Sequence, residues 1–115
     1  MRERIYIAGK ITGNLRYLDD FAKAERDLKA AGYAPANPAA ATRQLAESGG
    51  GWTHDEYMSI TREILDGCNG IYLLKGWRES MGAREEFMYI LERSKFDLNE
   101  CKILFEGELN NFEGE

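Results

Sequence analysis

A run in the second half of the chain combines residue types that small-molecule sites use. Residues 76–86 read GWRESMGAREE, in which Trp77 offers a stacking face, Ser80 a hydroxyl and the closing glutamates a carboxylate. An apolar run, IYLL at 71–74, precedes it, and a helix-like pattern follows. This order predicts a strand, a loop and a helix. Because ligands of open α/β sheets bind beyond the carboxyl ends of the strands, the run is expected to line a small-molecule site.

Helical spacing distinguishes the two glutamates at the end of this run. Ala83, Glu86 and Ile90 follow one another at helical intervals, whereas Glu85 aligns with Met88. Glu86 is therefore expected to border the buried side of the helix. The alternative is that both glutamates only favour the positive amino end of a helix and face water.

A second candidate loop follows the first predicted strand, RIYIA at 4–8. It reads Gly9-Lys10-Ile11-Thr12-Gly13 and lacks the full spacing of a dinucleotide fingerprint or a P-loop. Its backbone amides, with Lys10 and Thr12, could hold a sugar or a phosphate. Its two glycines could equally serve only to make a tight turn, and both interpretations remain open.

The other predicted elements alternate between helix and strand. Gly13-Asn14 predicts a turn and an N-cap. Residues 18–31 predict a helix that Gly32 ends, and residues 33–37 predict an edge strand. Thr53 and Glu56 form a capping box that opens a second helix with the apolar stripe Tyr57, Ile60, Ile64 and Leu65. A strand at 70–74 follows. A third helix, ending near Lys95, carries the apolar stripe Ala83, Phe87, Ile90 and Leu91. A last strand at 102–105 leads into an acidic tail at 106–115.

This alternation predicts one α/β domain over residues 1–115, a three-layer sandwich with a four- or five-stranded parallel sheet. The 115 residues suffice for a single core.

Composition excludes several classes of function. Fifteen basic and twenty acidic residues give a net charge of −5 without a basic block, so a nucleic acid polymer is not an expected partner. The sequence shows no His/Cys cluster for a metal, no cofactor fingerprint and no apolar run of membrane-spanning length. Cys68 and Cys101 show no disulfide pattern, and we expect a cytoplasmic protein with reduced thiols.

Five short motifs, taken in order, resemble a known group of proteins. They are IYIAG at 5–9, NPA at 37–39, YM at 57–58, IYLL at 71–74, and the Gly-Trp…Ser-x-Gly-Ala-x-x-Glu run at 76–86. Together they resemble short bacterial and phage members of the nucleoside 2-deoxyribosyltransferase-like superfamily, over most of residues 4–105. The resemblance implies a flavodoxin-like or Rossmann-like fold, an N-glycosidic substrate and a homo-oligomer with sites near subunit contacts.

The resemblance also implies roles for particular residues. The family nucleophile falls on Glu86, the tyrosine that holds it falls on Tyr6, and a serine that binds substrate phosphate or sugar falls on Ser80. Two family aspartates fall on neutral residues, Thr61 and Asn69. Glycoside cleavage usually takes two carboxyl groups, so these departures put full activity in doubt.

The sequence therefore predicts cleavage or deoxyribosyl transfer at the N-glycosidic bond of a nucleoside or nucleoside monophosphate. The competing hypothesis is a catalytically silent nucleotide-binding or interaction module, and a nucleotide-dependent oxidoreductase is disfavoured by the missing glycine fingerprint. The expected site comprises Tyr6, Gly9, Lys10, Thr12, Trp77, Ser80, Gly82 and Glu86. Trp77 could stack on a base or only pack over the sheet edge.

An excess of apolar residues on the second and third helices predicts self-association. The residues in question are Met58, Phe87, Met88, Tyr89 and Leu91.

Overall fold

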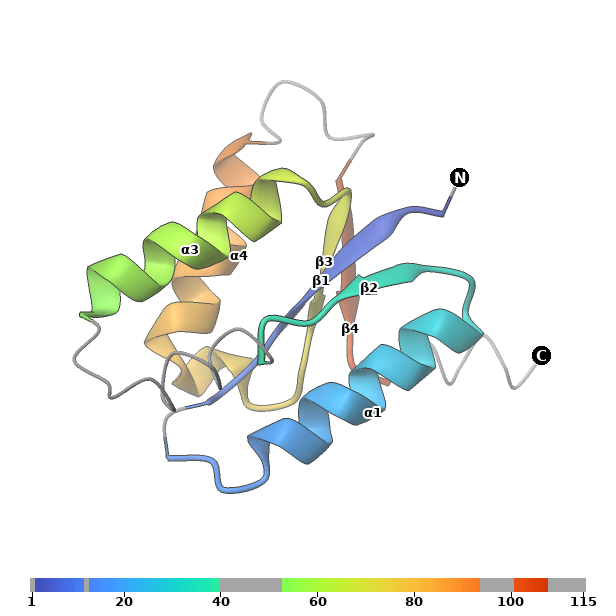
Figure 1. The fold of residues 1–115 in the computed structure, drawn as a ribbon, viewed down its shortest axis with the longest axis horizontal. Coiled ribbons are helices and arrows are strands. Elements are labelled where there is room, and N and C mark those ends of the chain that lie inside the picture. The colour runs from blue at the N-terminus through green and yellow to red at the C-terminus, as the bar shows by residue number, and fades with distance from the viewer. Residues whose placement is uncertain (1, 12, 40–52, 94–100, 108–115) are drawn as a thin grey trace.

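The protein folds as a parallel sheet with helices on both faces (Figure 1). The computed structural model describes residues 2–11, 13–39, 53–93 and 101–107. The elements are β1 (Arg4–Ala8), α1 (Tyr17–Ala30), β2 (Ala34–Ala36), α3 (His54–Asp66), β3 (Gly70–Leu73), the 3-10 helix η1 (Trp77–Glu79), α4 (Met81–Arg93) and β4 (Lys102–Phe105). The four strands run in the order β2-β1-β3-β4 and every pair is parallel. The predicted α/β three-layer sandwich with a four-stranded parallel sheet is confirmed.

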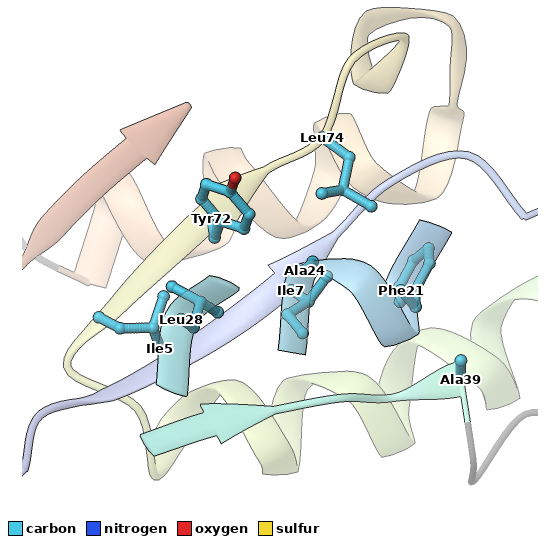
Figure 2. Packing of buried hydrophobic residues seen from close by; sticks show 8 residues of the cluster. All are labelled: Ile5, Ile7, Phe21, Ala24, Leu28, Ala39, Tyr72 and Leu74. Carbon is cyan, nitrogen blue, oxygen red and sulfur yellow. The ribbon is translucent and has the colours of Figure 1, made fainter. Parts of the chain in front are cut away.

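Strand β1 separates the two helical layers because its side chains alternate between the faces of the sheet. Ile5 and Ile7 pack against α1, where Phe21 and Leu28 meet them (Figure 2). Tyr6 points to the opposite face, which α3 and α4 cover, and joins a core with Leu65, Ile71, Ala83 and Ile90. Every residue of β1 after Arg4 is buried, as expected for a strand covered on both faces.

The order of the strands places a crevice beside β1. The chain crosses from β1 through α1 to β2 on one side, and then returns through α3 to β3 on the other side of β1. In open α/β sheets this reversal of strand order leaves a crevice at the carboxyl ends of the two diverging strands. The ends of β1 and β3, where Ala8 pairs with Leu73, mark that point.

Local capping agrees with the sequence at α3 and differs at α1. Thr53 and Glu56 form the predicted capping box, with both hydrogen bonds at 3.1 Å. The N-cap of α1 is Arg16, so the prediction of Asn14 as N-cap was wrong. The Asn14 side chain instead accepts a hydrogen bond from the Arg16 amide and donates one to the Lys10 carbonyl, which stabilises the loop after β1.

The buried face of α3 also differs from the predicted stripe. Met58, Thr61 and Leu65 are its buried residues, whereas Tyr57, Ile60 and Ile64 are half-buried. On α4, Ala83, Glu86 and Ile90 are buried, and the predicted stripe residues Phe87 and Leu91 are half-buried. The two helices pack on each other as well as on the sheet, so a stripe chosen by hydrophobicity alone was rotated from the true contact face.

Further predictions concern the ends of the helices, the edge strand and the C-terminal tail. Gly32 adopts a left-handed φ of 94° just after α1, and β2 is an edge strand, as predicted. The helix end near Lys95 and most of the acidic tail lie outside the described residues. The start of that tail is engaged, because the Glu106 carboxylate accepts a hydrogen bond of 2.7 Å from the Lys75 amide. None of the helices in the described ranges is long and apolar enough to cross a membrane.

Gly70 allows β3 and β4 to approach closely. A Cβ atom at this position would lie 2.3 Å from the Lys102 carbonyl oxygen, which belongs to the backbone and cannot rotate away. We expect Gly70→Ala to lower the free energy of unfolding by about 3 kcal/mol, as for overpacking of a dense core. Gly67→Ala is the matched control, because its Cβ would meet only ordinary contacts at 3.5 and 3.6 Å. Urea unfolding of both variants checks this, and equal stabilities would contradict it.

Candidate active site

A buried hydrogen bond between Tyr6 and Glu86 forms the centre of the candidate site. The Tyr6 hydroxyl donates to Oε2 of Glu86, and the two side chains are 0% and 3% exposed. Tyr6 comes from the middle of β1, and Glu86 from the second turn of α4. Residues 80 positions apart in sequence are thus joined inside the layer between the sheet and the helices.

The position of Glu86 on the inner face of α4 follows the predicted spacing. Ala83, Glu86 and Ile90 are the buried residues of the helix. Glu85 lies on the other side, in an outer groove between α3 and α4 that Met88 also lines. The alternative, in which both glutamates face water, is therefore wrong for Glu86.

Two further hydroxyl groups lie near this pair, from Thr61 and Tyr57 on α3. Thr61 is 1% exposed and donates a hydrogen bond of 3.1 Å to the Met58 carbonyl. Burial, and then the negative charge of Glu86, raise the pKa of Tyr6 well above its usual value, while an interaction with the Thr61 side chain opposes the rise. Burial and the charge of Glu86 likewise raise the pKa of Tyr57. Both phenols therefore keep their protons at neutral pH.

Ser80 and Gly82 lie at the amino end of α4, one turn from Glu86. Ser80 Oγ accepts a hydrogen bond of 3.1 Å from the Ala83 amide and so caps the helix. A Cβ on Gly82 would lie 3.9 Å from Ser80 Oγ, from Met58 Sδ and from Tyr57 Cε1. These residues therefore lie together at the start of α4. The sequence predicted two of them, Ser80 and Gly82, as site residues.

The glycine loop after β1 has structural roles that account for much of its sequence. A Cβ on Gly9 would lie 2.9 Å from Leu74 Cδ1, so glycine permits the end of β3 to pack against β1. The Lys10 ammonium lies 3.6 Å from the Glu79 carboxylate and links this loop to η1. Thr12 lies outside the described residues. The turn-making interpretation thus fits Gly13, which has a left-handed φ of 77°, whereas Gly9 serves close packing and Lys10 has an ionic partner.

Trp77 packs beside β4, at a separate place from the buried carboxylate. Its ring meets Phe87 edge-to-face at 5.1 Å between centroids, and Phe105 at 6.4 Å. It lines a groove formed by residues 73–79 with Phe105 and Glu106. The structure therefore supports packing over the sheet edge as the role of Trp77.

Glu86 is the one buried acidic side chain within the described ranges. Four other acidic residues do not join Glu86 as a buried second acid. Asp66 accepts a hydrogen bond of 2.6 Å from the Tyr89 hydroxyl, Glu79 pairs with Lys10, and Asp55 and Glu63 are exposed. Asn69 is exposed at the amino end of the strands, where its side chain accepts a hydrogen bond from the Arg4 amide. In the described part of the chain, no group of three or more His, Cys, Asp or Glu side chains could hold a metal ion.

Tyr57 is the site residue that the sequence analysis missed. It was assigned to the apolar stripe of the second helix, yet its ring faces Gly82 and its hydroxyl is within the electrostatic influence of Glu86. The available signal was its spacing, because Tyr57 precedes Thr61 by one helical turn and so shares its face.

Comparison with known proteins gives one result. No curated protein and no solved structure was found to match the chain. The model of one family, described as Domain of unknown function (DUF4406), matches residues 3–96, a range that contains both Tyr6 and Glu86. Since this match covers well over half of the 115 residues, the chain belongs to the DUF4406 family.

Proposed function

We propose that this protein cleaves, or transfers a deoxyribosyl group at, the N-glycosidic bond of a nucleoside or nucleoside monophosphate. The observation that carries the proposal is the buried Glu86, held by Tyr6 beside the crevice where strand order reverses. The motif resemblance to the nucleoside 2-deoxyribosyltransferase-like superfamily assigns the same two residues to nucleophile and holder. A buried carboxylate is costly unless it is hydrogen bonded, and such sites are common where chemistry is done.

In the proposed mechanism, Glu86 attacks C1′ of the sugar and forms a glycosyl-enzyme, which water or another base then resolves. Tyr6 donates to Oε2 and so fixes the orientation of the carboxylate, as a near-attack geometry requires. Almost complete exclusion of water from the pair strengthens its electrostatic interaction with a sugar that gains positive charge in the transition state.

The first turn of α4 is the proposed place for the polar end of the substrate. The amino end of a helix favours an anion, and Ser80 supplies a hydroxyl there beside Gly82, which carries no side chain of its own. Gly9 and Lys10, which follow β1, complete the proposed rim. We further propose that the protein works in the cytoplasm, without a cofactor and without a nucleic acid polymer as partner.

One observation favours the competing function, a nucleotide-binding module without catalysis. Glu86 has no second buried carboxyl group beside it within the described ranges, and Thr61 occupies the position where a family aspartate falls. Inverting and retaining glycosidases generally use two carboxyl groups. A low rate of turnover is therefore expected.

We also propose self-association through the outer face of α3 and α4. Met58 cannot contribute, because it is buried, which corrects the sequence prediction. The groove that remains is lined by Arg62, Met81, Arg84, Glu85, Met88, Tyr89 and Glu92, and its two methionines are 58% and 55% exposed. Arg84 and Glu92 lie four residues on either side of Met88. An antiparallel second copy centred on Met88 would therefore set Arg84 against Glu92 twice, as a two-fold interface requires.

Replacing the proposed nucleophile tests the mechanism. We expect Glu86→Gln to lower turnover by about 1,000-fold or more while nucleotide binding persists, because the amide keeps the shape and loses the nucleophilic charge. Glu85→Gln is the matched control on the outer side of the helix and should change turnover little. The measurement is base release from a panel of deoxynucleosides and their monophosphates, followed by chromatography. Undiminished turnover in Glu86→Gln would refute Glu86 as nucleophile.

Restoring a second carboxyl group tests the low expected rate. Thr61→Asp places an acid beside the Tyr6–Glu86 pair, and we expect it to raise base release by about tenfold or more, since general acid–base groups contribute on this scale and above. Thr61→Asn, of nearly equal size but without a titratable proton, is the control. If wild type and Thr61→Asp both bind nucleotide and release no base, the binding module becomes the better proposal.

Sedimentation velocity at micromolar concentration tests the assembly. We expect wild type to sediment as a dimer or larger, and Met88→Lys to shift it toward monomer, because the change places two like charges at the centre of the interface. Leu18→Lys, at a position 41% exposed on α1, should leave the assembly unchanged. A wild type that is strictly monomeric at these concentrations would contradict the proposed interface.

A further inference from the structure

Two pairs of residues face each other across α3 and α4, one helical turn apart. The inner pair is Thr61 and Glu86, both buried at the Tyr6 hydroxyl. Four residues earlier on each helix stand Tyr57 and Gly82. The phenol ring of Tyr57 lies against Gly82, since its Cε1 atom is 3.9 Å from where a Cβ on Gly82 would be. The outer pair therefore lies one turn nearer the amino ends of both helices.

That direction leads from the buried carboxylate toward solvent. In a parallel sheet joined by helices, the helices begin at the carboxyl edge of the strands, where the crevice lies. Tyr6, Thr61 and Glu86 are almost fully buried, whereas Tyr57 is half-buried. Of the hydroxyl groups around Glu86, that of Tyr57 is thus placed toward the entrance. A group that departs from a sugar held at Glu86 cannot leave inward, because the core residues Tyr6 and Thr61 fill that side.

Other donors near the entrance are engaged elsewhere. The Tyr6 hydroxyl donates its one proton to Glu86. The Lys10 ammonium pairs with Glu79, and Ser80, whose Oγ accepts from the Ala83 amide, is assigned to the polar end of the substrate in the proposed function. The remaining donor is the Tyr57 phenol, which has no acidic hydrogen-bond partner in the described contacts and whose ring lies beside Gly82 at the start of α4.

We propose that Tyr57 is the acid that protonates the departing base, in place of the second carboxyl group that glycosidases usually use. This inference rests on the proposed function. In the first step a C1′–Oε bond to Glu86 forms, the C1′–N bond breaks with its electron pair going to the base nitrogen, and the proton of Tyr57 Oη moves to the base. In the second step water attacks C1′, the ester bond to Glu86 breaks, and a water proton returns to the Tyr57 phenolate. The sum is a nucleoside plus water giving free base plus free sugar.

The charge of Glu86 couples the attack on C1′ to the protonation of the departing base. Burial and then this charge raise the pKa of Tyr57, so the phenol is protonated in the resting site. Attack on C1′ converts the carboxylate to a neutral ester and removes its charge. The pKa of Tyr57 then falls in the same step in which the base needs a proton, which is the timing that general acid catalysis requires.

Leaving groups of different quality test this assignment. Tyr57→Phe keeps the ring that packs on Gly82 and removes only the hydroxyl. The probes are 2′-deoxyguanosine, whose base needs a proton to leave, and N7-methyl-2′-deoxyguanosine, whose base leaves without one, each also as the 5′-monophosphate. We expect Tyr57→Phe to lower kcat about 100-fold or more on the unmethylated probes and less than about threefold on the methylated ones. Tyr33→Phe, before the edge strand β2, is the matched control and should not alter either rate.

The outcomes separate this inference from the function on which it rests. If wild type releases base and Glu86→Gln does not, yet Tyr57→Phe slows both kinds of probe equally or neither, the assignment of Tyr57 is refuted and the glycosidase stands. If wild type releases base from none of the probes, both are refuted. A thermal melt of Tyr57→Phe close to that of wild type shows that a selective loss comes from chemistry and not from unfolding.

Discussion

The hydrogen bond between Tyr6 and Glu86 is the constraint on which the site depends. A carboxylate that is 3% exposed would be strongly destabilising without a donor, and Tyr6 supplies one from the central strand. The same bond ties β1 to α4, which are far apart in sequence. Tyr6 lies on the face of β1 opposite to Ile5 and Ile7. A one-residue slip of this strand would therefore place an isoleucine against the carboxylate in place of the Tyr6 hydroxyl. The site can therefore form only when β1 pairs in this register.

The rest of the fold brings the amino ends of two helices to this bond. The capping box at Thr53 starts α3, and Ser80 caps α4, so both helices begin at the carboxyl edge of the sheet. Close packing at Gly9 keeps that edge narrow, since a side chain there would meet Leu74 just after β3. The first turn of α4, which holds Ser80 and Gly82, therefore lies at that edge, one turn from Glu86.

The groups around the carboxylate are hydroxyls and not a second acid. Burial and then the charge of Glu86 raise the pKa of both phenols and keep them protonated, so a site of this kind donates protons and hydrogen bonds more readily than it accepts them. That character suits a nucleophile whose charge is consumed during the reaction. The sequence predicted Trp77 as a stacking residue of the site, but its ring packs against Phe87 and against Phe105 at the end of β4.

The sequence by itself determined the fold class, the order of the elements and the inward position of Glu86, because these follow from local patterns. Alternating helices and strands, the capping box at Thr53 and the spacing of Ala83, Glu86 and Ile90 are all readable within one or two turns of chain. Only the tertiary structure decided which residues of α3 face inward, because that helix packs on α4 and, through Leu65, on the sheet, so hydrophobicity did not specify one contact face. For the same reason the sequence assigned Tyr57 to the core and Trp77 to the site. Their actual places depend on contacts with Gly82 and Phe105, which long-range packing alone brings near.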